Sequence, residues 1–123
     1  MSRYLFMVHS NAAPGLDAEY RDFIARHFDD IMALPGVIWG RRGAVAATQV
    51  RPAPDAHRYV AVFEVQTDDL QGFIDEMNAR VISGRMPRSA AVSDAQPVFW
   101  EVLQMDAASA ASPDRLSNIE TKT

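Results

Sequence analysis

The stretch 20–36 constrains the fold most, because it has the spacing of an amphipathic helix and a definite end. Its apolar side chains recur at intervals of three and four residues, at Tyr20, Phe23, Ile24, Phe28, Ile31 and Leu34. His27 falls close to the middle of this apolar face. Pro35-Gly36 then ends the helix, since proline cannot continue it and glycine tolerates the terminal turn. We therefore expect a helix whose core-facing side contains one titratable ring.

The residues before and after this helix have the composition of β-strands. Residues 3–9 are rich in aromatic and β-favouring side chains and predict the first strand. A turn at 10–16 leads to Asp17, which can serve as the N-cap of the helix. Residues 37–47 predict the second strand.

The second half of the chain repeats these patterns in a different order. Residues 48–56 contain two prolines and predict a connection, and 57–66 predict the third strand. Asp68 can cap a second helix in a D-x-x-Q box. The apolar stripe of this helix ends at Gly84. Residues 85–96 predict a loop.

Residues 97–105 predict a fourth strand, and 106–123 a mobile tail that lacks periodicity. The chain is thus expected to form one domain, 1–105, with the order βαββαβ. This order is typical of the α+β ferredoxin-like fold with a four-stranded antiparallel sheet.

The strands themselves predict a partner. Two helices can cover only one face of such a sheet, yet residues 4–8 and 59–63 are apolar on both faces. An uncovered apolar face would promote aggregation. We therefore expect a homodimer in which two sheets pack face to face, as in a dimeric α/β barrel.

Charge and composition exclude several classes of protein. The net charge is −4 and the basic residues are scattered, so nucleic acid is not an expected partner. The absence of cysteine excludes disulfides and thiolate chemistry. No apolar stretch approaches the roughly 20 residues that span a membrane, and the N-terminus resembles a strand more than a signal peptide. We expect a cytoplasmic protein. Its arginine-rich and alanine-rich composition indicates a bacterial source.

Several segments, in this order and spacing, resemble the EthD-like dimeric α/β-barrel proteins of bacterial catabolic gene clusters. The matching segments are His9-Ser10-Asn11 after the first strand, HFDDIMALPGV at 27–37, Arg41-Arg42, the strand 59–65 with TDDL at 67–70, and SGRMP at 83–87. The resemblance covers residues 3–105 and implies a small enzyme of catabolism. The chain departs from the family at Phe23-Ile24, where Trp-Tyr is common. It also lacks, in the second helix, the Tyr and His acid–base pair of a related plant cyclase.

His27 is the first candidate for catalysis. An imidazole on an apolar helix face loses hydration and needs a hydrogen-bond partner, which Asp30 at the edge of the same face could provide. A His–carboxylate pair is a plausible general base for a proton next to a carbonyl. The alternative is a core histidine whose nitrogens are bonded to the backbone. No histidine spacing typical of a metal site is present.

Other polar side chains could bind or polarise a carbonyl oxygen. His9, at the end of a strand, and Asn11 beside it are candidates for this role. Tyr20 and Tyr4 could donate a hydrogen bond to an oxyanion. His57 is expected to be exposed.

Arginine and aromatic residues could hold the substrate. Arg42 could bind a substrate carboxylate, although pairing of Glu64 with Arg41 or Arg42 across a hairpin is the structural alternative. An apolar ligand cavity between helices and sheet could be lined by Phe23, Trp39, Phe63, Met77 and Trp100. Such residues are more often ordinary core.

The leading hypothesis is a cofactor-independent catabolic enzyme of the isomerase, dehydratase or lyase type. It would use His27 as a base on a hydrophobic, carbonyl-bearing substrate. A cofactor-free or haem-dependent monooxygenase is one alternative, because related barrels carry out both reactions. A non-catalytic ligand-binding protein is another.

Overall fold

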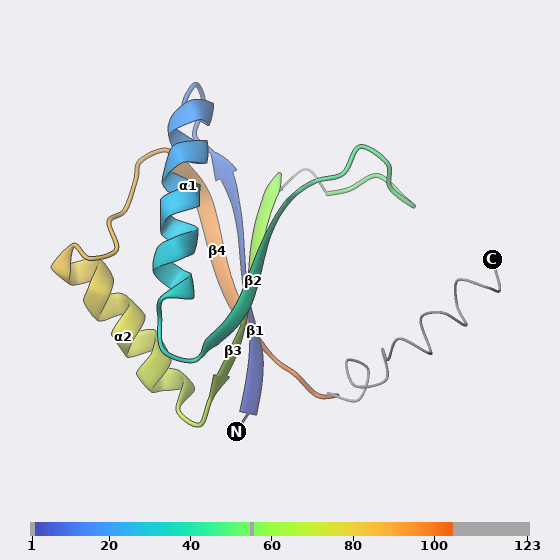
Figure 1. Ribbon diagram of the computed structural model, residues 1–123. Coiled ribbons are helices and arrows are strands. Elements are labelled where there is room, and N and C mark those ends of the chain that lie inside the picture. The colour runs from blue at the N-terminus through green and yellow to red at the C-terminus, as the bar shows by residue number, and fades with distance from the viewer. Residues whose placement is uncertain (1, 55, 105–123) are drawn as a thin grey trace.

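The computed structural model describes residues 2–54 and 56–104 of the chain. Its elements are β1 (Ser2–Ala12), α1 (Asp17–Met32), β2 (Val37–Ala44), β3 (Tyr59–Thr67), α2 (Leu70–Ser83) and β4 (Val92–Glu101). The four strands form one antiparallel sheet in the order β2-β3-β1-β4. The predicted ferredoxin-like βαββαβ arrangement is therefore confirmed (Figure 1).

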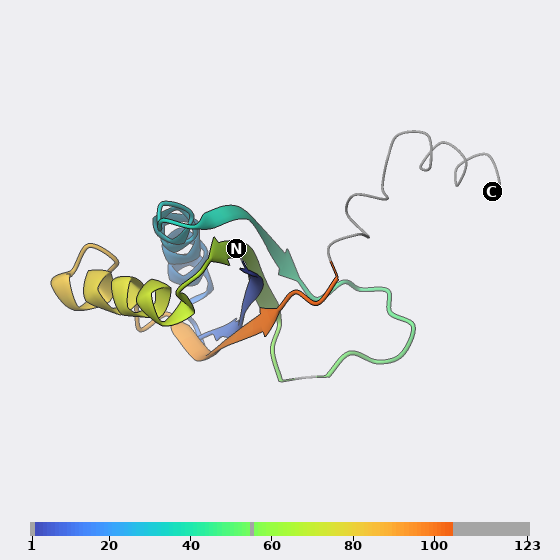
Figure 2. The same cartoon turned by 90° about the horizontal axis from the view of Figure 1, so that it is seen from below.

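Both helices pack on the same face of the sheet, which gives the protein two layers (Figure 2). Strand β1 is central, and alternate side chains of this strand point to opposite faces. Phe6 points to the helices, where it lies opposite Phe63 of β3 and Phe99 of β4. The Phe6 and Phe99 rings stack with centroids 4.3 Å apart. This row of rings joins three strands under the helices.

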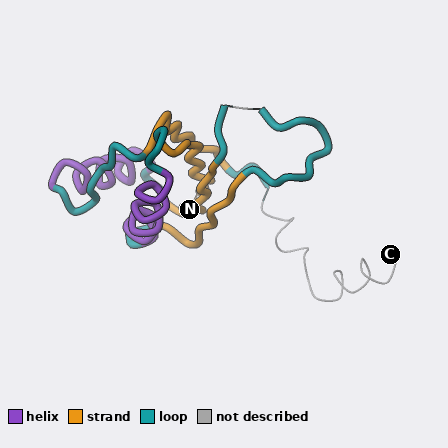
Figure 3. The backbone as a smooth tube through the Cα atoms, turned by 90° about the horizontal axis from the view of Figure 1, so that it is seen from above, coloured by secondary structure: helices purple, strands orange, loops and turns teal. Residues whose placement is uncertain are grey.

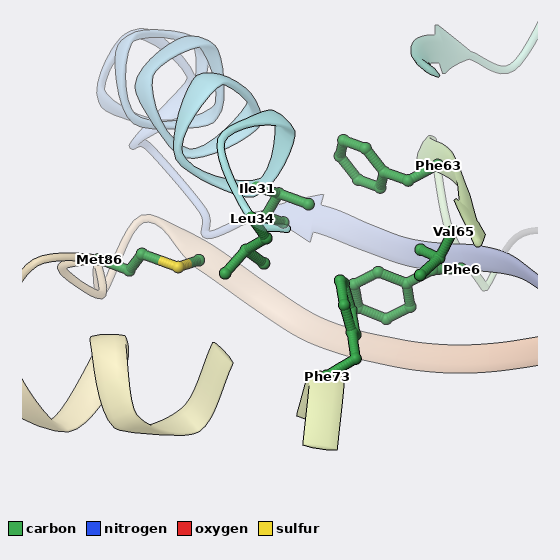
Figure 4. Close-up of a cluster of buried hydrophobic side chains, with 7 residues drawn as sticks. All are labelled: Phe6, Ile31, Leu34, Phe63, Val65, Phe73 and Met86. Carbon is green, nitrogen blue, oxygen red and sulfur yellow. The ribbon is translucent and has the colours of Figure 1, made fainter. Parts of the chain in front are cut away.

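The buried core lies between these rings and the helices (Figure 4). Its members come from the sheet, both helices and the α1–β2 and α2–β4 connections, and are Phe6, Ile31, Leu34, Phe63, Val65, Phe73 and Met86. The apolar stripes of the two helices supply their shares of this cluster, as the spacing of three and four predicts.

The helix ends differ from the expected caps by one residue each. Asp17 is the first residue of α1, and the N-cap position is Leu16, which makes no side-chain cap bond. In α2 the cap is Asp69, whose carboxylate accepts a hydrogen bond from the Gly72 amide at 2.9 Å. The prediction of Asp68 was wrong because the Asx cap bonds the amide three residues on, and that geometry selects Asp69.

Strand β4 begins at Val92, inside the segment 85–96 that was predicted to be a loop. Pro97 within it was read as a strand start, but β4 is an edge strand, where a residue without an N–H is tolerated. The ladder between β1 and β4 shifts register between His9 and Asn11, and Asp94 there has a positive φ of 53°. This irregularity lets β4 start earlier than its apolar run.

The connection between β2 and β3 extends away from the sheet on the side opposite the helices (Figure 3). The side-chain amide of Asn11 fastens its end, donating to the Ala56 carbonyl at 2.7 Å and accepting from the Arg58 amide at 2.8 Å. Asn11 thus has a structural role in holding this connection.

The other face of the sheet is apolar, and neither helix covers it. Leu5 lies opposite Trp100, and Met7 lies between Val62 and Val98. Trp100 is 56% exposed and Val98 is 41% exposed. The expectation that both faces of the strands are apolar is therefore confirmed within the described residues.

Glu64, on this open face, pairs with a different partner from the one predicted. Its carboxylate accepts a hydrogen bond from Arg3 at 2.9 Å, across the β1–β3 ladder. Arg41 and Arg42 of the neighbouring strand make other contacts, described below. The cation that pairs with Glu64 is therefore Arg3 of β1 and not an arginine of β2.

Two further predictions concern the C-terminal tail and membrane-spanning segments. The predicted tail, 106–123, lies outside the described residues. In the part of the chain that is described, neither helix combines the length and apolar character needed to cross a bilayer.

Gly40 of β2 is required by the packing of α1 on the sheet. A Cβ at this position would lie 2.7 Å from Phe63 and 2.9 Å from Met32. We expect Gly40→Ala to lower the free energy of unfolding by about 1–3 kcal/mol through overpacking. Gly43→Ala, in the same strand, would meet Val60 at an ordinary 3.6 Å and is the matched control. Urea unfolding at one protein concentration measures both, and equal stability of the two variants would contradict this account.

Candidate active site

A cavity of about 460 Å³ lies between α1 and the strands β1, β2 and β3. Its walls are mostly apolar, and its polar side chains come from four elements. They are Tyr20, Arg21 and His27 of α1, Ser10 of β1, Arg42 of β2 and Tyr59 of β3. A largely apolar cavity of this size with a few convergent polar groups is the usual form of a small-molecule site.

His27 lines this cavity and has an unusual environment. Its Nδ1 is enclosed and has no hydrogen-bond partner among the described residues. Its ring stacks on Phe23 with centroids 5.1 Å apart. Burial lowers the pKa of His27 below the ordinary 6.5, and the nearby charge of Asp30 only partly offsets this. His27 is therefore neutral at pH 7 and has a free lone pair on one ring nitrogen.

Asp30 does not orient the His27 ring in the predicted way. The enclosed Nδ1 accepts no bond from any described group and donates none, so the carboxylate acts on the ring only through its charge. The helical spacing of three residues brings the two side chains near each other without bringing them into contact.

Tyr20 lies two turns before His27 on the same face of α1 and is buried. Its hydroxyl is 2.8 Å from that of Ser10, which is also buried. Burial raises the pKa of Tyr20 above its ordinary value of 10, an effect that the Ser10 hydrogen bond and the Arg42 charge reduce. The phenol therefore keeps its proton at neutral pH. When Ser10 donates to Tyr20, the phenol proton is free for an oxygen in the cavity.

Arg42 extends over the helix-covered face of β2. Its guanidinium lies 5.4 Å from the centre of the Phe28 ring, a cation–π contact at the cavity wall. Arg41, the preceding residue, points to the opposite face, contacts Trp39 and donates to the Gly40 carbonyl. The pleat of the strand thus sends the two arginines to different surfaces.

The cavity brings together some of the predicted site residues and leaves others elsewhere. His27, Tyr20, Arg42 and Phe63 line it, and Phe23 lies behind the His27 ring. The residues that do not line it are Tyr4, His9, Asn11, Asp30, Trp39, Met77 and Trp100. Trp39 and Trp100 lie on the open face of the sheet, and Met77 packs against the core from α2.

His9 lies on the opposite face from the cavity, because it alternates with Ser10 along β1. Its ring is 5.7 Å from that of His57. The predicted exposure of His57 was wrong: its side chain is 13% exposed, and its Nε2 lies 3.0 Å from the Asp94 carboxylate. These residues connect the start of β3 to the irregular part of β4.

Three polar residues of the cavity were not predicted from the sequence: Ser10, Arg21 and Tyr59. The alternation of side chains along a strand could have identified Ser10 and Tyr59. Ser10 is in phase with Phe6 along β1, and Tyr59 is in phase with Phe63 along β3. The Tyr59 ring packs 4.8 Å from that of Tyr20. Arg21 gave no such signal, because an exposed charged side chain on a helix usually belongs to the solvated surface.

Metal-ligand residues do not converge in the described part of the chain. No group of three or more His, Asp or Glu side chains there is placed to hold a metal ion.

No family model and no curated protein matches the chain, whereas many solved structures share its fold. A hydroxynitrile lyase from Passiflora edulis has a TM-score of 0.66 at 10% identity, with coverage of 84% of this chain and 95% of that one. A mutant of a cofactor-independent oxygenase from Streptomyces nogalater has a TM-score of 0.55 at 14% identity, covering 85% and 97%. A dimeric ferredoxin-like protein of unknown function from Thermobifida fusca has a TM-score of 0.56 at 10% identity, covering 82% and 92%. At these identities the likeness establishes the fold.

The environment of His27 makes a prediction about stability. An enclosed polar atom without a partner costs about 1–3 kcal/mol. We therefore expect His27→Leu to be as stable as the wild type at pH 7.5, or more stable by about 1 kcal/mol. The measurement is urea unfolding at one protein concentration. His57→Leu is the contrasting variant, because it loses a real partner in Asp94 and should be less stable.

The same variant should change the pH dependence of stability. Because the folded-state pKa of His27 is below the unfolded value near 6.5, the unfolded chain binds the proton first as the pH falls. This contribution to stability is complete above pH 6.5 and is lost as the pH decreases toward the folded-state pKa. Wild type should therefore lose more stability than His27→Leu between pH 7.5 and 5.5. A parallel loss in both proteins would show that His27 does not titrate as described.

Proposed function

We propose that the protein is a small cofactor-independent enzyme of the isomerase, dehydratase or lyase type. Its substrate would be a hydrophobic, carbonyl-bearing molecule bound in the cavity beside α1. The observation that carries this proposal is the neutral His27 ring, held in an apolar wall with one nitrogen unpartnered. A core histidine would be expected to have both nitrogens satisfied.

The cavity contains the two groups that proton abstraction next to a carbonyl requires. His27 accepts the proton from carbon through its Nε2, since Nδ1 is enclosed. The electron pair of the broken C–H bond moves toward the carbonyl oxygen and makes an enolate. The Tyr20 phenol, protonated and polarised by Ser10, donates a hydrogen bond to that oxygen. Return of the proton to another carbon gives isomerisation, and loss of a leaving group gives elimination.

The low dielectric of the cavity assists both groups. A base works best when its pKa is close to the working pH, and a neutral imidazole in an apolar wall is ready to accept a proton. The phenol donates more strongly to a developing oxyanion when water is excluded. Phe28, Ile24 and Phe63 supply apolar walls of the cavity.

We also propose the finer assignments that the sequence suggests. The chain would belong with the EthD-like dimeric α/β-barrel proteins and act in the cytoplasm of a bacterium. A second copy of the chain would cover the open apolar face that includes Leu5, Met7 and Trp100. Support comes from the apolar composition of that face and from the similar fold of the dimeric protein of Thermobifida fusca.

An oxygenase is the second candidate, favoured by the likeness to the cofactor-independent oxygenase of Streptomyces nogalater. It would use the same deprotonation by His27 before reaction with oxygen. Oxygen consumption without an added cofactor distinguishes it from the first proposal. A Soret band in purified protein would instead indicate the haem-dependent version, for which His27 is the available imidazole of the cavity.

The base is tested by exchange of carbon-bound protons. We expect the wild type, in D₂O, to catalyse deuterium incorporation next to the carbonyl of hydrophobic ketones such as phenylacetone, measured by proton NMR. His27→Gln should lower the exchange rate by about 100-fold or more, as expected for removal of a general base. Tyr20→Phe should lower it by up to about 100-fold through loss of the oxyanion donor.

His9→Gln is the matched control, because His9 lies on the other face of the sheet and should leave exchange unchanged. Full exchange by His27→Gln would overturn the assigned base. Binding of ketones without any exchange in the wild type would favour the non-catalytic ligand-binding alternative.

The dimer is tested by charge on the open face. Val98→Glu places a carboxylate on each of the two packed sheets, and it should shift the dimer to monomer in sedimentation velocity at micromolar concentration. Ile82→Glu, on α2 at a position 86% exposed, should leave the dimer intact. A monomeric wild type in the same measurement would overturn the proposed pairing.

A further inference from the structure

We propose that the natural ligand of the cavity beside α1 is an organic acid: an apolar, ring-sized body that bears a carboxylate. This proposal deepens the proposed function and depends on it for the reaction that the ligand undergoes. The preference for an anion is argued separately, from the charged residues around the cavity. Two arginines and no acidic residue line the cavity.

The charge balance of the cavity is opposite to that of the chain. The protein has 16 acidic and 12 basic residues and a net charge of −4. Random placement would bring carboxylates to the cavity wall at least as often as arginines. The wall nevertheless has Arg21 and Arg42 and not one Asp or Glu. Both arginines are exposed beside a mostly apolar cavity, and such an imbalance gives a local positive potential that attracts anions.

Arg42 is placed to use that potential. Its stem runs along the helix-covered face of β2, and its guanidinium is held against the Phe28 ring. No described acidic side chain forms an ion pair with it. A guanidinium presents a planar set of donors that fits a carboxylate in two parallel hydrogen bonds. The Phe28 contact restricts the side chain and so reduces the entropy lost on binding.

Arg21 approaches the same cavity from α1, beside Tyr20. It is exposed and likewise lacks a described ion-pair partner. Arg21 and Arg42 thus reach one cavity from helix and sheet. We assign Arg42, which contacts Phe28, as the binding residue and Arg21 as a contributor to the potential at the wall.

The rest of the wall defines the body of the ligand. Tyr20, Phe28, Tyr59 and Phe63 present aromatic surfaces, while the small side chains of Ala25, Ala44 and Ala61 leave the space between them. A flat ring system would fill that space, with its carboxylate toward β2 and its reactive carbon toward His27. The substrate class is therefore a carbonyl compound that also carries an acidic group.

A pair of probes with equal shape and different charge tests this inference. The ligands are 3-phenylpropanoate and its amide, 3-phenylpropanamide, titrated into full-length protein at pH 7.5 and low salt by isothermal titration calorimetry. We expect the acid to bind the wild type about tenfold or more tightly than the amide, because its bonds to arginine are charge-assisted. Added salt should reduce the difference in affinity between the acid and the amide, because it screens the charge of the arginines.

Four glutamine variants separate local from general charge effects. Arg42→Gln should abolish the preference for the acid, and Arg21→Gln should reduce it partly. The controls, Arg41→Gln on the other face of β2 and Arg26→Gln on α1, remove the same charge from positions that do not line the cavity. Both controls should keep the wild-type preference.

The possible results either support or overturn the inference. Equal binding of acid and amide, binding of neither at millimolar concentration, or an unchanged preference in Arg42→Gln would overturn it. Loss of preference in Arg42→Gln with retention in Arg41→Gln would support it. His27→Gln should retain the preference for the acid over the amide. If the proposed base chemistry fails, this binding preference is unaffected. If the anion preference fails, deuterium exchange of neutral ketones is unaffected.

Discussion

The alternation of side chains along β1 is the constraint on which the rest of the structure depends. Because the pleat has a period of two, Phe6 and Ser10 face the helices while Met7 and His9 face the open side. The first set supplies the aromatic row of the core and one hydroxyl of the cavity. The second set supplies the apolar face that needs cover. A shift of one residue in register would exchange these roles at every position of the strand.

The cavity exists because one end of the same layer has small side chains. Toward α2 the space above the sheet is filled by the rings of Phe6, Phe73 and Phe99. Beneath α1, the sheet instead has the small side chains of Ala44 and Ala61. The sheet is closely packed toward α2 and has small side chains beneath α1. The cavity therefore lies beside α1, the helix that contains His27.

Periodicity predicted the elements and their order, but the partners of polar groups were beyond its reach. The two helical stripes and the two-faced strands followed from spacing alone. The pairing of Glu64 with Arg3, and the seating of Asp94 against His57, depend on strand order and on an irregular ladder, which spacing does not specify. The candidate site was predictable in part for the same reason. His27 and Tyr20 lie on one helical face, and Arg42 was also predicted to bind substrate, whereas Ser10 comes from a strand whose register had to be seen.

His27 is where local rules of packing are broken, and this makes it more informative than a well-satisfied residue. An apolar side chain would fit the face of α1 at this position, as Met77 fits that of α2. A ring with an enclosed, unpartnered nitrogen costs free energy that a leucine would not. Natural proteins accept such costs mainly where a function depends on them. The two arginines of the same cavity are exposed and therefore solvated, but no described carboxylate forms an ion pair with either. The unpartnered imidazole and the two arginines without an ion-pair partner border a single cavity, which is the arrangement expected if one ligand requires both.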